Sequence, residues 1–151
     1  ILPASGFEHY EISNFAKEGF ISQHNSSYWR GVPYLGLGPS AHSFNGKTRQ
    51  WNVRSNAGYV SKVSEGKPFF ELEELTETDR LNEQIMIGLR TKWGIEKDTM
   101  EAIKRGAWSQ MVSGIPDADA TNFILSGTKL LLSQKGKLVA DRLAAELFFD
   151  Q

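Results

Sequence analysis

The second half of the chain carries apolar residues at a helical spacing. Over residues 76–93, an apolar side chain recurs at every fourth position, at Leu81, Ile85, Leu89 and Trp93. This period places the four side chains on one face of a helix. Thr76 or Thr78 can cap the first turn, and Gly94 follows the last apolar position. The sequence therefore predicts a helix over residues 76–93.

Shorter elements are predicted after this helix. Four further helices are expected, over residues 96–105, 108–112, 117–126 and 134–148. Residues 129–132 are apolar and are expected to be extended, and Ser133 can cap the helix that follows. Several helices, one short strand and a final helix, in this order, suggest a small winged-helix-like module.

The first half of the chain has shorter patterns. Its expected elements are a strand at 10–13, a loop at 14–23, a strand at 34–37 and a short helix at 56–65. The dipeptide Asn45-Gly46 lies between the strand-like residues 41–44 and 48–53. Because Asn-Gly readily adopts the positive φ angles of a two-residue hairpin turn, these residues predict a β-hairpin.

The two halves suggest an α+β chain with a boundary near residues 66–75. The chain opens on an apolar residue instead of Met, and its first expected strand has no partner before it. A strand in an α/β protein is usually preceded by other strands and helices. We therefore expect a fragment of a larger α/β protein.

Composition excludes several classes of function. The 151 residues include 17 basic and 18 acidic side chains, so the net charge of −1 predicts no general attraction to nucleic acid or anionic lipid. No apolar run is long enough for a transmembrane segment. The chain has no cysteine, which excludes disulfides, thiolate metal sites and iron–sulfur ligation by its own residues. A cytoplasmic location fits this composition.

The segment His-Asn-Ser-Ser-Tyr-Trp is the first candidate for chemistry. His24 can offer a ring nitrogen to a metal centre, and Asn25 can orient that ring by a hydrogen bond. Tyr28 and Trp29 supply flat apolar surface that suits a planar ligand. A histidine at the surface, or one hydrogen-bonded in the core, explains His24 as well, and the spacing alone names no ligand.

Two further groups of residues are weaker candidates. Gly36 and Gly38 can let the backbone approach a ligand closely, but a tight turn at a strand end explains them equally. They lack the third glycine of the dinucleotide fingerprint. Strand alternation places Glu11 and His9 on one face, which faces either a site or solvent.

Four motifs in order resemble the HemW family of radical S-adenosylmethionine proteins. They are "HYEISNFA", "HNSSYWRG", "YLGLGPSAHSF" and "RQWNV". The tail "LLLSQKGKLVADRLAAEL" is similar to the end of the C-terminal domain that this family shares with the oxygen-independent coproporphyrinogen III oxidases. The resemblance covers the chain from Gly6 to about Phe148 and implies a haem chaperone.

The resemblance also implies a fold and site residues. Residues 1–66 would be the last strands of a partial (β/α) radical S-adenosylmethionine barrel with a hairpin, and 67–151 the winged-helix-like C-terminal domain. The haem motif of the family falls on His24, Asn25, Tyr28 and Trp29, with His24 as the ligand of the haem iron. Contacts to S-adenosylmethionine fall on Gly36, Gly38, Ala41 and Glu11.

One departure from the family limits what this chain can do alone. The family holds a [4Fe–4S] cluster through a Cys-x3-Cys-x2-Cys motif, and this chain has no cysteine. We therefore expect that it lacks radical catalysis by itself. The expected partners are haem or another porphyrin, a haem-acceptor protein and a second copy in a homodimer, with no nucleic acid.

Two other functions stay open. In the first, the whole protein is an oxygen-independent coproporphyrinogen III oxidase that decarboxylates propionate side chains, with Arg30, Arg49 and Arg54 available to bind carboxylates. In the second, the C-terminal half is a non-enzymatic winged-helix interaction module.

Overall fold

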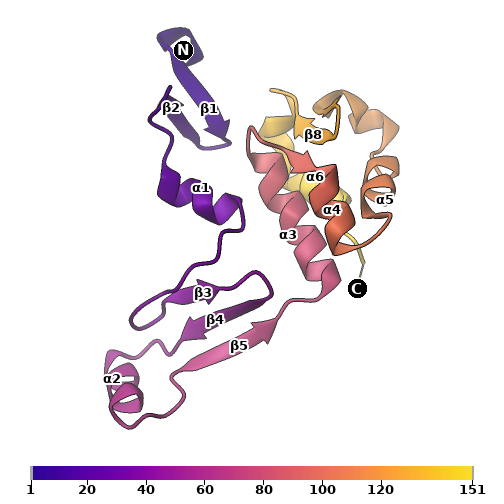
Figure 1. Cartoon of the computed structure of the whole chain (residues 1–151). Helices are drawn as coiled ribbons and strands as arrows, with labels where there is room; N and C mark the ends of the chain where they lie inside the picture. The colour runs from indigo at the N-terminus through magenta and orange to yellow at the C-terminus, as the bar shows by residue number, and fades with distance from the viewer. Residues whose placement is uncertain (1, 151) are drawn as a thin grey trace. The chain divides into compact units, whose positions relative to one another are not determined.

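The computed structural model describes residues 2–150, which divide into two units. The first unit joins Ile1–Trp29 to Thr76–Gln151, and the second is Arg30–Leu75. Figure 1 labels their elements. The predicted boundary at 66/67 falls within the second unit, because residues 70–74 pair with the strand at 48–52 there. Whether 67–151 forms a domain of a longer protein stays a prediction.

The first unit begins with a β-hairpin and a short helix. After a 3-10 turn, η1 (Pro3–Ser5), strands β1 (Phe7–Glu11) and β2 (Asn14–Lys17) pair antiparallel, with an irregularity in the register between His9 and Glu11. Helix α1 (Gln23–Trp29) follows. The loop predicted at 14–23 is therefore wrong over β2, because these residues pair with β1.

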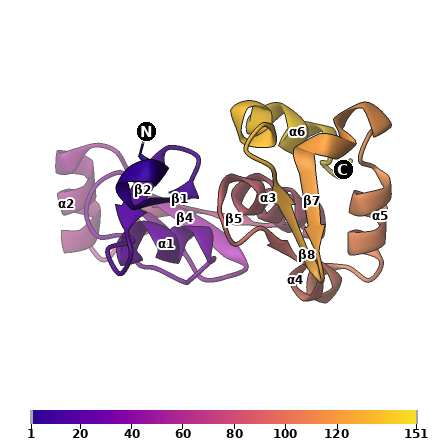
Figure 2. The same cartoon turned by 90° about the horizontal axis from the view of Figure 1, so that it is seen from above.

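The rest of the first unit is mainly helical. Its elements are α3 (Glu77–Arg90), β6 (Ile95–Glu96), α4 (Lys97–Ile103), α5 (Ala107–Ser113), η2 (Asp117–Asn122), β7 (Phe123–Ser126), β8 (Lys129–Leu132), η3 (Gly136–Val139) and α6 (Ala140–Glu146). The three strands form an antiparallel sheet in the order β6-β8-β7. Figure 2 shows the β7–β8 hairpin along its length.

Helix α3 lies at the centre of this core. Thr76 caps it through a capping box with Asp79, in which each side chain accepts the other residue's backbone N–H. Its apolar stripe is buried against α4, α6 and β8. The largest side chains that are fully buried in this core are Leu81, Ile85, Leu89, Met100, Met111, Leu130 and Leu143. The helix predicted from the four-residue spacing is confirmed, although it ends at Arg90, before Trp93.

Two predicted helices differ from the structure. Residues 117–126 form one 3-10 segment followed by β7, because residues 123–126 pair along their whole length with β8. The helix predicted at 134–148 divides into η3 and α6, since Val139 leaves the helical conformation at φ −131°. The Oγ of Ser133 accepts the N–H of Gly136 at 3.1 Å, a cap-like hydrogen bond, although the residue directly before η3 is Lys135.

The second unit is a small sheet with one helix. Strands β3 (His42–Phe44), β4 (Thr48–Asn52) and β5 (Phe70–Glu74) pair antiparallel in the order β3-β4-β5, and α2 (Asn56–Ser64) connects the last two. The predicted hairpin and helix are confirmed. The strand expected at 34–37 is a single bridge, in which Tyr34 and Phe44 exchange both backbone hydrogen bonds.

Among residues 2–150, no helix has both the length and the apolar character needed to cross a membrane.

Candidate functional site

Helix α1 carries the His-Asn-Ser-Ser-Tyr-Trp motif. The residues of the motif lie on different sides of the helix. Ser22 begins the helix, because its Oγ accepts the Asn25 N–H at 3.2 Å. His24 and Tyr28 are four positions apart and both are exposed. Their rings meet edge to face, with centroids 5.0 Å apart and planes at 90°. The helix therefore presents an imidazole and a phenol together on its exposed side.

The ring of His24 is available to a ligand. Within the part of the chain that the structure describes, no hydrogen bond reaches either ring nitrogen, from the Asn25 side chain or from any other residue. The same residues contain no group of three or more His, Asp or Glu side chains that could hold a metal ion. His24 can thus supply one nitrogen ligand to a metal whose other ligands come from elsewhere, as a porphyrin provides.

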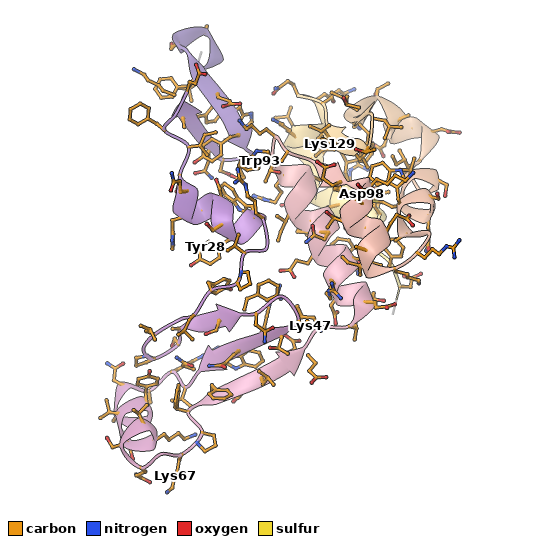
Figure 3. The ribbon with its side chains drawn as sticks, in the orientation of Figure 1. Tyr28, Lys47, Lys67, Trp93, Asp98 and Lys129 are labelled. Atoms are coloured by element: carbon orange, nitrogen blue, oxygen red, sulfur yellow. The ribbon has the colours of Figure 1, made fainter. Side chains whose placement is uncertain are left out.

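Trp29 lies in a different environment from Tyr28. Its indole packs against Tyr10 of β1 at 5.8 Å and against Trp93 at 6.5 Å between ring centroids. Tyr10 and Trp93 are themselves 6.5 Å apart, and Tyr10 is only 4% exposed. Figure 3 shows Tyr28 and Trp93 on opposite sides of α1. Trp29 therefore anchors the helix, while His24 and Tyr28 remain accessible.

Glu11 is buried, and its carboxylate makes hydrogen bonds and an ion pair with other residues of this chain. Its Oε2 accepts the Ser13 N–H at 2.9 Å and the Asn14 side-chain amide at 2.6 Å, and its Oε1 lies 3.2 Å from the Arg90 guanidinium. Burial raises the pKa of the Glu11 carboxyl, but the hydrogen bonds from Asn14 and Ser13 and the charge of Arg90 outweigh it, so the pKa lies below its usual value. The carboxylate is a structural anchor in this chain.

The alternation predicted for β1 does not hold at this point. The irregular register between His9 and Glu11 puts Tyr10 and Glu11 both in the interior, whereas His9 is half-buried and stacks on Phe15 at 4.2 Å. A β-bulge locally breaks the two-residue period on which the prediction relied.

In the second unit, the Gly-Leu-Gly-Pro-Ser-Ala segment is fastened to β4. The Asn52 side chain, 1% exposed, donates to the carbonyl oxygen of Gly38 at 2.9 Å and to that of Gly36 at 3.4 Å. The Ala41 carbonyl accepts the Asn52 N–H at 2.9 Å. These hydrogen bonds fix the segment without any ligand.

Glycine is required at the two positions of this segment for different reasons. A Cβ on Gly36 would lie 2.1 Å from the His42 carbonyl oxygen, so only glycine fits this close approach. Gly38 has φ +95°, and a Cβ there would meet nothing within 4 Å. Gly36 is thus required by packing and Gly38 by its backbone conformation, which leaves the outer side of Gly38 open to a contact.

The second unit also contains an open hollow of about 430 Å³. Its lining residues carry no formal charge; they are Pro33, Tyr34, Leu35, Ser43, Phe44, Asn45, Thr48 and Gln50. A neutral lining offers no ionic partner to the carboxylates of a porphyrin.

Sequence reasoning missed Tyr10, Trp93 and Asn52 as parts of these arrangements. Trp93 ended an apolar stripe and was expected in the core, and Asn52 lay unremarked in the "RQWNV" motif. No local pattern signals a contact between side chains so distant in the sequence.

The fold is similar to part of a known radical S-adenosylmethionine enzyme. The structure matches coproporphyrinogen III oxidase (HemN) from Escherichia coli, a radical SAM enzyme, with a TM-score of 0.67 over 97% of this chain and 38% of that chain. The two sequences are 17% identical, so this likeness establishes the fold alone. No protein-family model matches the chain.

Comparison of the sequence with those of known proteins gives more closely related proteins. The chain is 39% identical over 97 residues to a haem chaperone HemW of Bacillus subtilis, covering 64% of this chain and 26% of that protein. It is 30% identical over 148 residues to HemW of Mycobacterium tuberculosis, covering 97% and 36%. It is also 30% identical to a mitochondrial radical S-adenosyl methionine domain-containing protein 1 of Danio rerio, covering 99% and 38%.

The chain is therefore HemW-like over nearly its whole length, and the resemblance predicted from the four motifs is confirmed. It spans 26% to 38% of the length of these relatives.

Proposed function

We propose that this chain is the C-terminal portion of a haem chaperone and that it contacts haem through helix α1. His24 would supply one axial nitrogen, Tyr28 would lie against the porphyrin, and Asn25 and Trp29 would complete the motif. The observation that carries this proposal is the exposed imidazole of His24, which meets the exposed Tyr28 ring edge to face and whose own ring nitrogens make no hydrogen bond to a described residue. Relatives named as haem chaperones support it.

The residues of this chain fit haem better than they fit an iron–sulfur cluster. A haem iron needs one protein nitrogen at the least, which His24 offers, whereas a [4Fe–4S] cluster needs thiolates, and the chain has none. When bound, haem supplies the iron and the porphyrin that a chaperone delivers. The chain's own part is to bind the iron from one side and to shield one porphyrin face with the Tyr28 ring.

For the whole protein, we propose an S-adenosylmethionine site that includes this chain's glycine segment. Gly38 and Ala41 would contact S-adenosylmethionine, and the open space beside Gly38 supports its part in this proposal. Gly36 and Glu11 have partners within the chain and would serve the site by holding its backbone. The cluster would be ligated by residues outside this sequence.

We further propose the architecture and setting that the family implies. Residues 1–66 would complete a radical S-adenosylmethionine barrel, and 67–151 would form a winged-helix-like domain, which the helix order and the β6-β8-β7 sheet support. The whole protein would be cytoplasmic, would pass haem to an acceptor protein and would form a homodimer.

The fold match favours one alternative, an oxygen-independent coproporphyrinogen III oxidase. In that reading, the whole protein would decarboxylate two propionates of its substrate, and Arg30, Arg49 and Arg54 would bind carboxylates. Turnover of coproporphyrinogen III by the full-length protein without oxygen would support this alternative, and its absence would remove it.

A haem titration of the chain tests the proposal. We expect a saturable shift of the Soret band and a loss of affinity of roughly tenfold or more in His24→Ala, because an axial ligand is removed. His42→Ala is the matched control, since His42 is also exposed but lies on β3 in the second unit. Equal affinities of wild type and His24→Ala would contradict the role of His24.

A further inference from the structure

The segment that follows α3 is paired with β1. The backbone N–H of Ile12 donates to the Arg90 carbonyl, and the N–H of Lys92 donates to the Tyr10 carbonyl, each at 3.0 Å. Glu11 and Thr91 form the antiparallel bridge between these two bonds. Residues 90–92 therefore act as a short partner strand for the end of β1.

Side chains reinforce this pairing on both sides. The buried Glu11 carboxylate meets the Arg90 guanidinium at 3.2 Å, and Glu8 meets the Lys92 ammonium at 2.6 Å. Thr91 is 4% exposed and its hydroxyl donates to the Gly88 carbonyl. The position of the next residue, Trp93, is thus fixed relative to β1.

Trp93 links this paired segment to helix α1. Its indole contacts Tyr10 and Trp29, each at 6.5 Å between ring centroids. The Lys92 ammonium lies 5.6 Å from the centroid of the Trp93 ring. Helix α1 has only seven residues, and a helix of this length depends on tertiary packing for its stability. The contact with Trp93 is one of the aromatic contacts that hold Trp29 and so orient the helix.

We propose that Trp93 is a positioning residue for the haem motif. It holds Trp29, and through the rigid turn of α1 it fixes the direction in which His24 and Tyr28 face. The inference rests on the haem-binding role proposed for α1. It assigns to the region after α3 a supporting part in a site that the motif alone places in residues 24–29.

Haem titrations of three variants test this role. Trp93→Leu keeps an apolar side chain but removes the flat ring, whereas Trp93→Phe keeps an aromatic ring. We expect Trp93→Leu to weaken haem affinity about fivefold or more and Trp93→Phe to restore it to within about twofold, from the usual strength of two aromatic contacts. Trp51→Leu, which removes a tryptophan from β4 in the second unit, is expected to leave the affinity unchanged.

The spectrum separates positioning from ligation. Because His24 remains the ligand, the Soret maximum of bound haem is expected at the same wavelength in wild type and Trp93→Leu, with only the affinity changed. Circular dichroism tests whether each variant is folded. If Trp93→Leu is unfolded, the double-mutant cycle of Trp29→Phe and Trp93→Met replaces it, and coupled losses of affinity are expected.

The outcomes distinguish the two proposals. Loss of affinity in both His24→Ala and Trp93→Leu, with rescue by Trp93→Phe, supports both. Loss in His24→Ala alone, or additive effects in the cycle, overturns the role of Trp93 and leaves the haem proposal intact. Unchanged binding in His24→Ala overturns the haem proposal, and the role of Trp93 falls with it.

Discussion

Removing the Glu11 carboxylate should destabilise the first unit by a measurable amount. In Glu11→Ala, the Ser13 N–H and the Asn14 amide lose their acceptor, and the Arg90 guanidinium keeps only its bond to Asp141. Breaking a fully buried ion pair costs about 3–5 kcal/mol. Arg90 is 30% exposed, so water can replace part of its interaction. We therefore expect the free energy of unfolding to fall by about 2 kcal/mol, the range of one or two charged hydrogen bonds.

Urea denaturation followed by tryptophan fluorescence measures this change. In a Trp51→Phe background, the remaining tryptophans, Trp29, Trp93 and Trp108, all belong to the first unit. With an m value of about 2 kcal/mol per molar urea, the midpoint should fall by about 1 M.

Glu8→Ala is the matched control for this experiment. It removes the ion pair with Lys92, in which Glu8 is 44% exposed, and should cost at most about 0.5 kcal/mol. A loss in Glu11→Ala no larger than that in Glu8→Ala would refute the reasoning, because it would mean that the buried cluster around Glu11 is not formed in solution.

Three further predictions follow from the same structure. The pKa of Glu11 is lowered on folding, so its stabilisation is complete above the unfolded value of 4.5 and is lost as pH falls through the folded value; the stability difference between wild type and Glu11→Gln, measured by urea denaturation, should shrink as the pH falls below 4.5, and a constant difference would contradict this. Ile85→Ala should lower the free energy of unfolding by about 3 kcal/mol, measured by urea denaturation, since Ile85 is fully buried, and a loss below about 1 kcal/mol would contradict its place in the core. Gly36→Ala should reduce the hydrogen-exchange protection of the Phe44 and Asn52 amides, because its Cβ would overlap the His42 carbonyl, and unchanged protection would contradict this close approach.

The sequence predicted those elements whose signals are local. The spacing of Leu81, Ile85 and Leu89 located α3, and Thr76 marked its start, because capping and amphipathic burial act within a few turns. The hairpin was also predicted, although its two-residue turn is Gly46-Lys47. Asn45 pairs with Thr48 instead, and its side-chain oxygen accepts two backbone N–H groups.

Elements that depend on distant partners were not predictable in this way. Residues 123–126 look helical in isolation and become a strand because β8 is beside them. Residues 23–29 show no apolar period, so the helix that holds the motif had no sequence signal. Once that helix is known, the pairing of His24 with Tyr28 follows from their spacing of four. The contact of Trp29 with Trp93 does not, because it depends on how residues 90–92 pair with β1.

The most direct test of the haem proposal is imidazole rescue of His24→Ala. The account predicts that ferric haem bound to this variant has a Soret maximum different from that of wild type, and that added imidazole restores the wild-type position by replacing the missing ring. A variant whose Soret spectrum equals that of wild type before imidazole is added would contradict His24 as the axial ligand.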